Sequence, residues 1–177
     1  VLFRSAKKYI DIIEKKSEVM QKLVEDFYEV SIIEDKSYEY VLDKLMPGYL
    51  MEDMVMSCYD ELGSEGIDVK FEMIEDKEVL GNASALSRVY ANLLSNIKKH
   101  GCEYAIIHHS IIDGKLTTTI TNKIKPQATL EEARLFEKFY TGEKSRHQTS
   151  SGIGMYSSKI MLEKMNHQIS EIGRAHV

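Results

Sequence analysis

A long helical pattern near the start of the chain is the feature that most restricts its fold. Across residues 6–36 apolar side chains recur at helical spacing, charged side chains fill the opposite face, and neither Gly nor Pro interrupts the pattern. We expect one amphipathic helix of roughly 30 residues, whereas helices in globular proteins average about 11–12 residues. Its apolar stripe includes Ile10, Ile13, Met20, Val24 and Phe27.

A stripe of this length needs a partner. A helix upstream of Ala6, a second copy of the chain, or both would cover it in a helical bundle. The alternative is an ordinary core helix of one domain. We favour pairing, because no later stretch of the sequence offers a helix of comparable length.

Length and charge restrict the kinds of partner. The 177 residues suffice for one domain with a core and a short appended element, and the net charge is −5. Since a negative chain has no cationic field to attract nucleic acid or an anionic membrane surface, we expect neither as the main partner. No apolar run approaches the roughly 20 residues of a membrane span. Cys58 and Cys102 lack metal-ligand spacing and fit reduced thiols in a reducing compartment, with a disulfide between them left open.

Both ends of the sequence can be translated adapter DNA. Residues 1–5 and 171–177 back-translate to one adapter sequence read on opposite strands, apart from a small mismatch. We therefore predict that both are library-derived and leave them out of fold reasoning. Residues 6–170 are then expected to be an internal piece of a longer reading frame, with neighbouring elements lacking at both ends.

The order of the remaining elements predicts an α/β (α+β) two-layer sandwich, in which helices cover one face of a mixed sheet. The clearest local signal is Asp113-Gly114, which predicts a tight hairpin, and Asn82 is placed to cap a helix. We expect strands at 37–42, 67–74, 104–112 and 115–121, and helices at 51–62, 83–99, 130–136 and 153–164. We expect loops at 122–129 and 141–151, and the start of another strand at 165–170. The adjacent His108 and His109 would point to opposite faces of their strand and cannot line one site.

Two stretches predict a nucleotide site. Asn92 and Asn96 lie four residues apart in the helix at 83–99, so their carboxamides share one face with Lys99 nearby. Gly152 and Gly154 bracket a single residue before the last helix, which suits close approach of an anion to a helix N-terminus. Each feature alone is more often a surface amide or a turn, but the set favours a nucleotide.

Three motifs resemble those of sensor histidine kinases. NLLSNIKK at 92–99 resembles the N box of the family, LFEKFYTGEKSR at 135–146 resembles its F box and the following segment, and SGIGMYSSKIM at 151–161 resembles its second glycine box and helix. They occur in the family's order, which is more specific than any one motif. The helix at 6–36 lies where the family places the second helix of its dimerisation and phosphotransfer hairpin, so the resemblance covers residues 6–170.

The resemblance implies a Bergerat-type ATP-binding domain at 37–170 and names its metal and phosphate ligands. Asn96 would coordinate Mg²⁺, and Asn92 would help to order the waters of the metal, which prefers oxygen ligands. Lys99 would place an ammonium near the phosphates. Gly152 and Gly154 would let the end of a flexible lid approach them.

The resemblance also implies roles for residues around the rest of the nucleotide. Arg146, and with it Lys144, would reach the terminal phosphate during transfer, so the implied catalytic set is Asn92, Lys99 and Arg146. His100 would lie beside the nucleotide. The family's first glycine box is replaced by TNKIKP at 121–126, where Asn122 is the nearest match and would accept from the adenine amine without a charge.

The phosphate acceptor is not among the histidines of this chain. None of the six His is followed by Asp or Glu, as the family motif requires. We therefore expect the accepting His upstream of Ala6, and we do not expect residues 6–170 alone to autophosphorylate. The strand that usually follows the last helix is also expected to be truncated, which leaves a sheet edge open.

The sequence thus predicts the ATP-binding catalytic part of a sensor histidine kinase. It would transfer the γ-phosphoryl group of Mg·ATP to a His and thence to a response regulator. The resemblance implies a homodimer through the N-terminal helix and a cytoplasmic location, with a membrane reached only through missing upstream segments. The alternatives are a Ser/Thr kinase or anti-sigma module of the same fold, or a degenerate interaction module without catalysis.

Overall fold

A computed structural model describes residues 2–126, 131–141 and 151–171. Its helices are α1 (Leu2–Ile33), α2 (Pro47–Ser64), α3 (Ala83–His100) and α4 (Gly154–Lys164), with a 3-10 turn at Glu132–Arg134. Its strands are β1 (Asp43–Leu45), β2 (Ile67–Met73), β3 (Val79–Gly81), β4 (Gly101–Ile112) and β5 (Lys115–Ile124).

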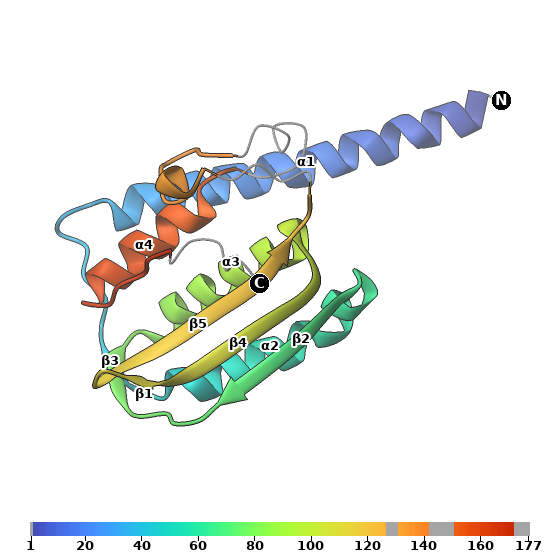
Figure 1. Ribbon diagram of the computed structural model, residues 1–177. Helices are drawn as coiled ribbons and strands as arrows, with labels where there is room; N and C mark the ends of the chain where they lie inside the picture. Colours follow the sequence, from blue (N-terminus) through green and yellow to red (C-terminus); the bar gives the residue numbers. More distant parts are fainter. Residues whose placement is uncertain (1, 127–130, 142–150, 172–177) are drawn as a thin grey trace.

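The main sheet has the order β2-β4-β5. Strand β2 runs parallel to β4, and β4 runs antiparallel to β5, so the sheet is mixed as predicted. Helices α2 and α3 pack against each other and against β2 and β4, and α4 packs on α3 (Figure 1). The predicted two-layer arrangement is confirmed, with α1 and α4 lying beyond α3.

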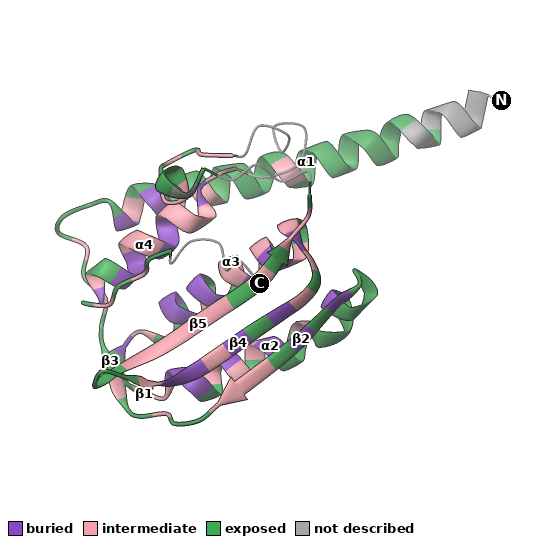
Figure 2. Cartoon of the chain, viewed as in Figure 1, coloured by how far each residue is buried: buried purple, intermediate pink, exposed green. Residues whose placement is uncertain are grey.

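The core lies between the sheet and these helices (Figure 2). Alternate residues of β4 face it, and Ala105, Ile107 and His109 are fully buried. Helix α3 contributes its apolar stripe, as its period of 3.6 residues requires. The largest fully buried side chains among the described residues are Ile33, Met51, Leu62, Ile67, Ile107, Met161, His109, Val30, Val89 and Ser158.

Local signals placed α3 and the hairpin correctly. The Asn82 side chain accepts a hydrogen bond from the N–H of Ala85 at 3.0 Å, which is the predicted cap. Asp113 and Gly114 both have positive φ, at 50° and 76°, as a tight two-residue hairpin turn demands. Cys58 and Cys102 are free thiols.

Several predicted bounds were wrong. Residues 37–42 form no strand, because Tyr38 and Tyr40 stack edge to face at 5.1 Å and pack on the core, and the strand begins at Asp43. Its partner β3 was not predicted. Strand β5 continues through Asn122 into the predicted loop, since β4 begins at Gly101 and pairs that far. In place of the helix predicted at 130–136, the described residues 131–136 contain only the 3-10 turn Glu132–Arg134. Helix α2 begins at Pro47, earlier than predicted, and continues through Gly63. No strand is assigned at 165–170.

A buried carboxylate ties β2 to the start of α2. The side chain of Asp76 is 4% exposed and accepts from the N–H of Gly48 at 2.8 Å. Its other oxygen lies 3.0 Å from Nε2 of His109, whose Nδ1 lies 2.7 Å from the Thr118 hydroxyl. A side chain at Gly48 would meet Asp76 and His109 within 2.7 Å, so glycine is required there. His108 points to the other face, as predicted, and its Nδ1 lies 3.6 Å from the Glu72 carboxylate.

Among the residues of α1 whose burial is described, only two near its C-terminal end are buried. Val30 and Ile33 are 1% and 2% exposed, whereas Ile13, Met20 and Val24 are 64%, 66% and 66% exposed (Figures 1 and 2). The helix extends over residues 2–5, and their assignment to adapter DNA stays a prediction. In the described part of the chain, no helix combines the length and the apolar character that crossing a membrane requires.

Replacement of Asp76 by alanine should destabilise the fold by about 3 kcal/mol, because buried donors on α2 and His109 lose their acceptor at about 1–3 kcal/mol each. Denaturation with urea measures the free energy of unfolding. Asp68→Ala removes an exposed carboxylate from β2 and should change it by less than about 0.5 kcal/mol. Equal effects of the two substitutions would contradict a structural role for the buried carboxylate.

Candidate functional site

One face of α3 carries the predicted polar residues. Asn92 and Asn96 are half-buried and Lys99 is exposed, whereas Leu94 and Ile97 between them are turned into the core. The predicted spacing on one helical face is therefore confirmed. The face stays polar because it is the side of α3 that does not meet the sheet.

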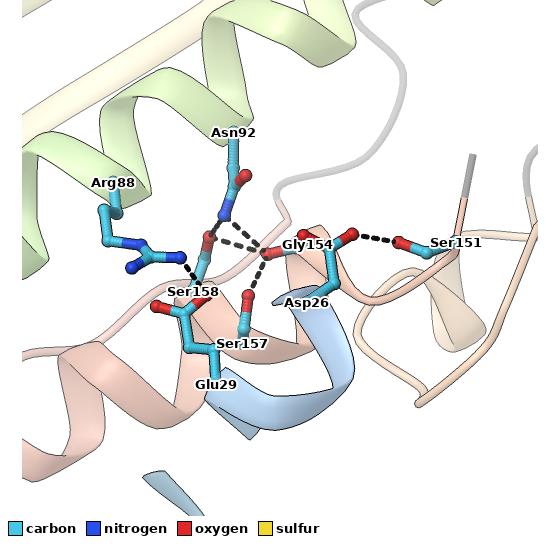
Figure 3. A network of polar contacts seen from close by, with 8 residues as sticks. All are labelled: Asp26, Glu29, Arg88, Asn92, Ser151, Gly154, Ser157 and Ser158. Atoms are coloured by element: carbon cyan, nitrogen blue, oxygen red, sulfur yellow. Dashed lines mark hydrogen bonds and ion pairs between the residues drawn. The ribbon is translucent and has the colours of Figure 1, made fainter. Parts of the chain in front are cut away.

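The start of α4 lies directly against Asn92. The Asn92 carboxamide nitrogen donates to the carbonyl of Gly154 and to the hydroxyl of Ser158, both at 3.1 Å (Figure 3). A Cβ on Gly154 would lie 3.4 Å from Asn92 Oδ1. The structure thus brings together two features that the sequence separates by 62 residues.

Glycine is needed at position 152 because the backbone there lies very close to the backbone of Tyr140. The φ of Gly152 is 65°, and a Cβ would come within 2.7 Å of the carbonyl oxygen of Tyr140. Its own carbonyl accepts from the N–H of Phe139 at 3.1 Å. Among the described residues, no side chain caps the helix that follows, so no described side chain competes with an anion for the N–H groups of its first turn.

Asn96 and Lys99 continue the face beyond Asn92. Within the described residues, no hydrogen bond is formed by the carboxamide of Asn96 and no ion pair by the ammonium of Lys99. Partial desolvation, followed by the positive charge of Lys22, lowers the pKa of Lys99. The ammonium is thus in a place where an added anion would be stabilised.

His100 and Asn122 lie at the far end of α3. Desolvation, followed by the positive charges of Lys99 and Lys125, lowers the pKa of His100. The carboxamide nitrogen of Asn122 donates to the carbonyl of Lys123 at 3.3 Å and would lie 3.4 Å from a Cβ on Gly101. No contact joins Asn122 to Asn92 or Asn96 in the part of the chain that the structure covers. Lys144 and Arg146 lie outside the described residues.

Helix α1 supplies carboxylates that the sequence did not point to. The Ser151 hydroxyl donates to Asp26 at 2.8 Å, and Arg88, one turn before Asn92, pairs with Glu29 (Figure 3). Desolvation raises the pKa of Glu29 although Arg88 opposes the shift. Further along, Glu34 accepts from Lys138 at 2.7 Å. Since these carboxylates lie on a helix separate in sequence, no local pattern marked them.

The comparisons with known proteins agree with this geometry. Residues 81–175, more than half of the chain, match the family described as "Histidine kinase-, DNA gyrase B-, and HSP90-like ATPase". The chain belongs to this ATPase family. The match contains α3, the hairpin and α4, which are the elements that build the site.

Relatives and solved structures of the ATPase family extend the match to α1. The chain is 27% identical over 163 residues to the sensor histidine kinase YcbM of Bacillus subtilis, covering 89% of this chain and 52% of that protein. It therefore spans about half the length of this curated relative. Full-length ShkA in complex with AMPPNP matches with a TM-score of 0.72 at 17% identity, over 90% of this chain and 34% of that chain.

A third similarity is to histidine kinase ThkA in complex with the response regulator protein TrrA. The TM-score is 0.65 at 21% identity, over 91% of this chain and 45% of that chain. At these identities the likeness to ShkA and ThkA concerns the fold. The predicted fold and family resemblance are confirmed.

The residues of this ATPase-family site fit a magnesium nucleotide. Asn96 offers an amide oxygen with no partner among the described residues, and Mg²⁺ takes oxygen ligands from protein, phosphate and water. The uncapped start of α4 and the ammonium of Lys99 suit phosphates. No group of three or more His, Cys, Asp or Glu side chains that could hold a metal occurs within the described residues.

The lowered pKa of His100 makes stability depend on pH. Because the folded chain disfavours the charged imidazole, the unfolded chain binds a proton more readily below about pH 6.5, the ordinary value for His. The free energy of unfolding contributed by His100 is therefore present above that pH and is lost as pH falls through the folded-state pKa. His100→Gln should reduce the loss of stability between pH 7.5 and 5, measured by urea denaturation. Parallel profiles of the variant and the unchanged chain would contradict this assignment.

Proposed function

We propose that this chain is the ATP-binding catalytic part of a sensor histidine kinase. In the intact protein it would transfer the γ-phosphoryl group of Mg·ATP to a His outside residues 6–170, and from there to an Asp of a response regulator. The observation that carries the proposal is the contact of Asn92 with Gly154. It places the polar face of α3 against the uncapped start of α4, so that groups suited to metal and to phosphate adjoin.

The residues of this site act mainly by binding and orienting. A bound Mg²⁺ would supply positive charge that offsets part of the charge of the phosphates. Asn96 offers its oxygen to the metal, Asn92 offers its own to the metal's waters, and Lys99 adds a positive charge toward the phosphates. Because phosphoryl transfer depends on position and charge stabilisation, no strong general base is required among these side chains.

The remaining nucleotide contacts are proposed from sequence position. Asn122 and His100 lie together at the end of α3, where the Asn122 oxygen can accept from the adenine amine. Lys144 and Arg146 precede Gly152 in the chain and are proposed to reach the terminal phosphate, where a guanidinium stabilises developing charge.

The similar proteins support the kinase over its alternatives. YcbM is a sensor histidine kinase, ShkA was solved with AMPPNP, and ThkA was solved with a response regulator. The similarity to each of these proteins covers about nine-tenths of this chain. Such coverage is unexpected for a Ser/Thr kinase or anti-sigma module lacking the long helix. The Asn96 oxygen and the Lys99 ammonium have no partners in the described chain. A degenerate interaction module would have no use for such groups, whereas a nucleotide site would.

We further propose that α1 pairs with a second copy in the intact protein. The side chains of Ile13, Met20 and Val24 form an apolar stripe that the other described residues leave exposed. A soluble protein rarely leaves such a stripe exposed along several helical turns. The proposed location is cytoplasmic, as the catalytic part of a sensor anchored through other segments.

Asn96→Ala should weaken magnesium-dependent binding of a fluorescent ATP analogue to the full chain, because the protein's amide ligand for the metal is lost. We expect affinity to fall at least about tenfold, as one charge-assisted contact requires. Lys98→Ala is the matched control, since Lys98 lies two residues away on the same helix and pairs with Glu61 of α2. An unchanged chain that binds no nucleotide at millimolar concentration would favour the interaction module.

Val24→Glu should weaken self-association of the chain at least about tenfold, because an unpaired charge would be buried between two helices. Sedimentation equilibrium measures the dissociation constant. Lys15→Ala makes the same change in net charge on the polar face of α1 and should leave the constant within about twofold. Equal association of both variants would argue against pairing through the stripe.

A further inference from the structure

The carbonyl of Gly154 fixes which way round the Asn92 carboxamide lies. A carbonyl oxygen can only accept, so the Asn92 atom 3.1 Å from it must be the amide nitrogen. The opposite orientation would place two acceptors against each other. Asn92 Oδ1 is therefore turned away from this carbonyl and is left as an acceptor (Figure 3).

Ser158 provides the second support for the same amide. Its side chain is fully buried, and its hydroxyl donates to the carbonyl of Gly154 at 2.8 Å. The single hydroxyl proton is thereby used, so the oxygen meets Asn92 as an acceptor, at 3.1 Å from the amide nitrogen. The two amide hydrogens of Asn92 thus have one acceptor each.

Ser157 is an internal comparison for Ser158. It is 2% exposed, and its hydroxyl also donates to the carbonyl of Gly154, at 3.0 Å. It makes no hydrogen bond to Asn92 within the described residues (Figure 3). The two serines therefore share residue type, helix, burial and acceptor, and they differ in the contact with the amide.

We propose that Ser158 is a positioning residue for Asn92, holding the carboxamide so that its oxygen faces the metal and its waters. This inference rests on the proposed function, since it assigns Ser158 a part in magnesium nucleotide binding. Because Ser158 and Gly154 both belong to α4, the orientation of a side chain on α3 is set by α4. Gly154 contributes by lacking a Cβ, which would lie 3.4 Å from the oxygen that must stay accessible.

The contact itself is tested without any ligand. The side-chain amide signals of Asn92 in the ¹⁵N-labelled full chain are identified by their loss in Asn92→Ala. Ser158→Ala should raise the hydrogen exchange rate of this amide about fivefold, whereas Ser157→Ala should leave it within about twofold, because only the first removes an acceptor worth about 1 kcal/mol. Equal exchange in both variants overturns the assigned contact.

The positioning role is tested with AMPPNP as the probe, by calorimetry with and without Mg²⁺. Ser158→Ala should weaken binding roughly three- to tenfold with Mg²⁺ and hardly at all without it, as loss of one hydrogen bond permits. Ser157→Ala should match the unchanged chain in both conditions. In an Asn92→Ala background, Ser158→Ala should have no further effect, since a residue acting through Asn92 has nothing left to position.

The possible outcomes separate this inference from the proposed function. Loss of affinity that is equal with and without Mg²⁺, or that persists in the Asn92→Ala background, shows a merely structural role and overturns the inference alone. An unchanged chain that binds no AMPPNP overturns the proposed function and the positioning role with it. If Ser158→Ala does not fold, Ser158→Cys retains the size, weakens the acceptor and should give the same magnesium-dependent loss. Ser158→Thr keeps the hydroxyl and should bind AMPPNP with Mg²⁺ as the unchanged chain does.

Discussion

The hydrogen bond from the Asn92 carboxamide to the carbonyl of Gly154 is the interaction on which the site depends. It joins α3, which is held by the core, to the start of α4, which lies outside the two main layers. Without this contact the polar face of α3 would be an ordinary hydrated helix surface. With it, the polar face of α3 and the start of α4 adjoin, and the proposed site combines this helix start with the amide of Asn96 and the ammonium of Lys99, which have no partners among the described residues.

The hydrogen-bonding groups of the protein divide into those that hold the fold and those left for a ligand. Asp76 and His109 are buried and satisfied by each other, by Thr118 and by the start of α2. The Asn96 oxygen and the Lys99 ammonium have no such partners in the described chain. A buried polar group without a partner costs free energy, so the fold pairs its buried groups with one another. The accessible groups that have no partner in the described chain are therefore the ones that a ligand would bind. An amide oxygen suits a hard cation and an ammonium suits an anion, so the two groups together fit a ligand that contains both.

The sequence predicted what local signals determine. Asn82 and the Asp113-Gly114 pair placed α3 and the hairpin, and the helical spacing of Asn92 and Asn96 placed their shared face. Strands β1 and β3 were missed or misplaced because each has three residues and pairs across 38 positions at its outer end, Asp43 with Gly81. Ser158 lies inside the motif at 151–161, but nothing in the sequence distinguishes it from Ser157, and the carboxylates of α1 carry no motif, since an acid on a polar helix face is common. Their roles follow only from tertiary contacts.

The most direct test of the account is an NMR titration of the full chain with AMPPNP in the presence of Mg²⁺. The account predicts the largest shifts at the backbone amides of Gly152 and Gly154 and at the side-chain amides of Asn92 and Asn96. Amides of β2, on the far edge of the sheet, should hardly move. Saturable shifts confined to β2 or to the outer face of the sheet, with the signals of α3 and α4 unchanged, would contradict it.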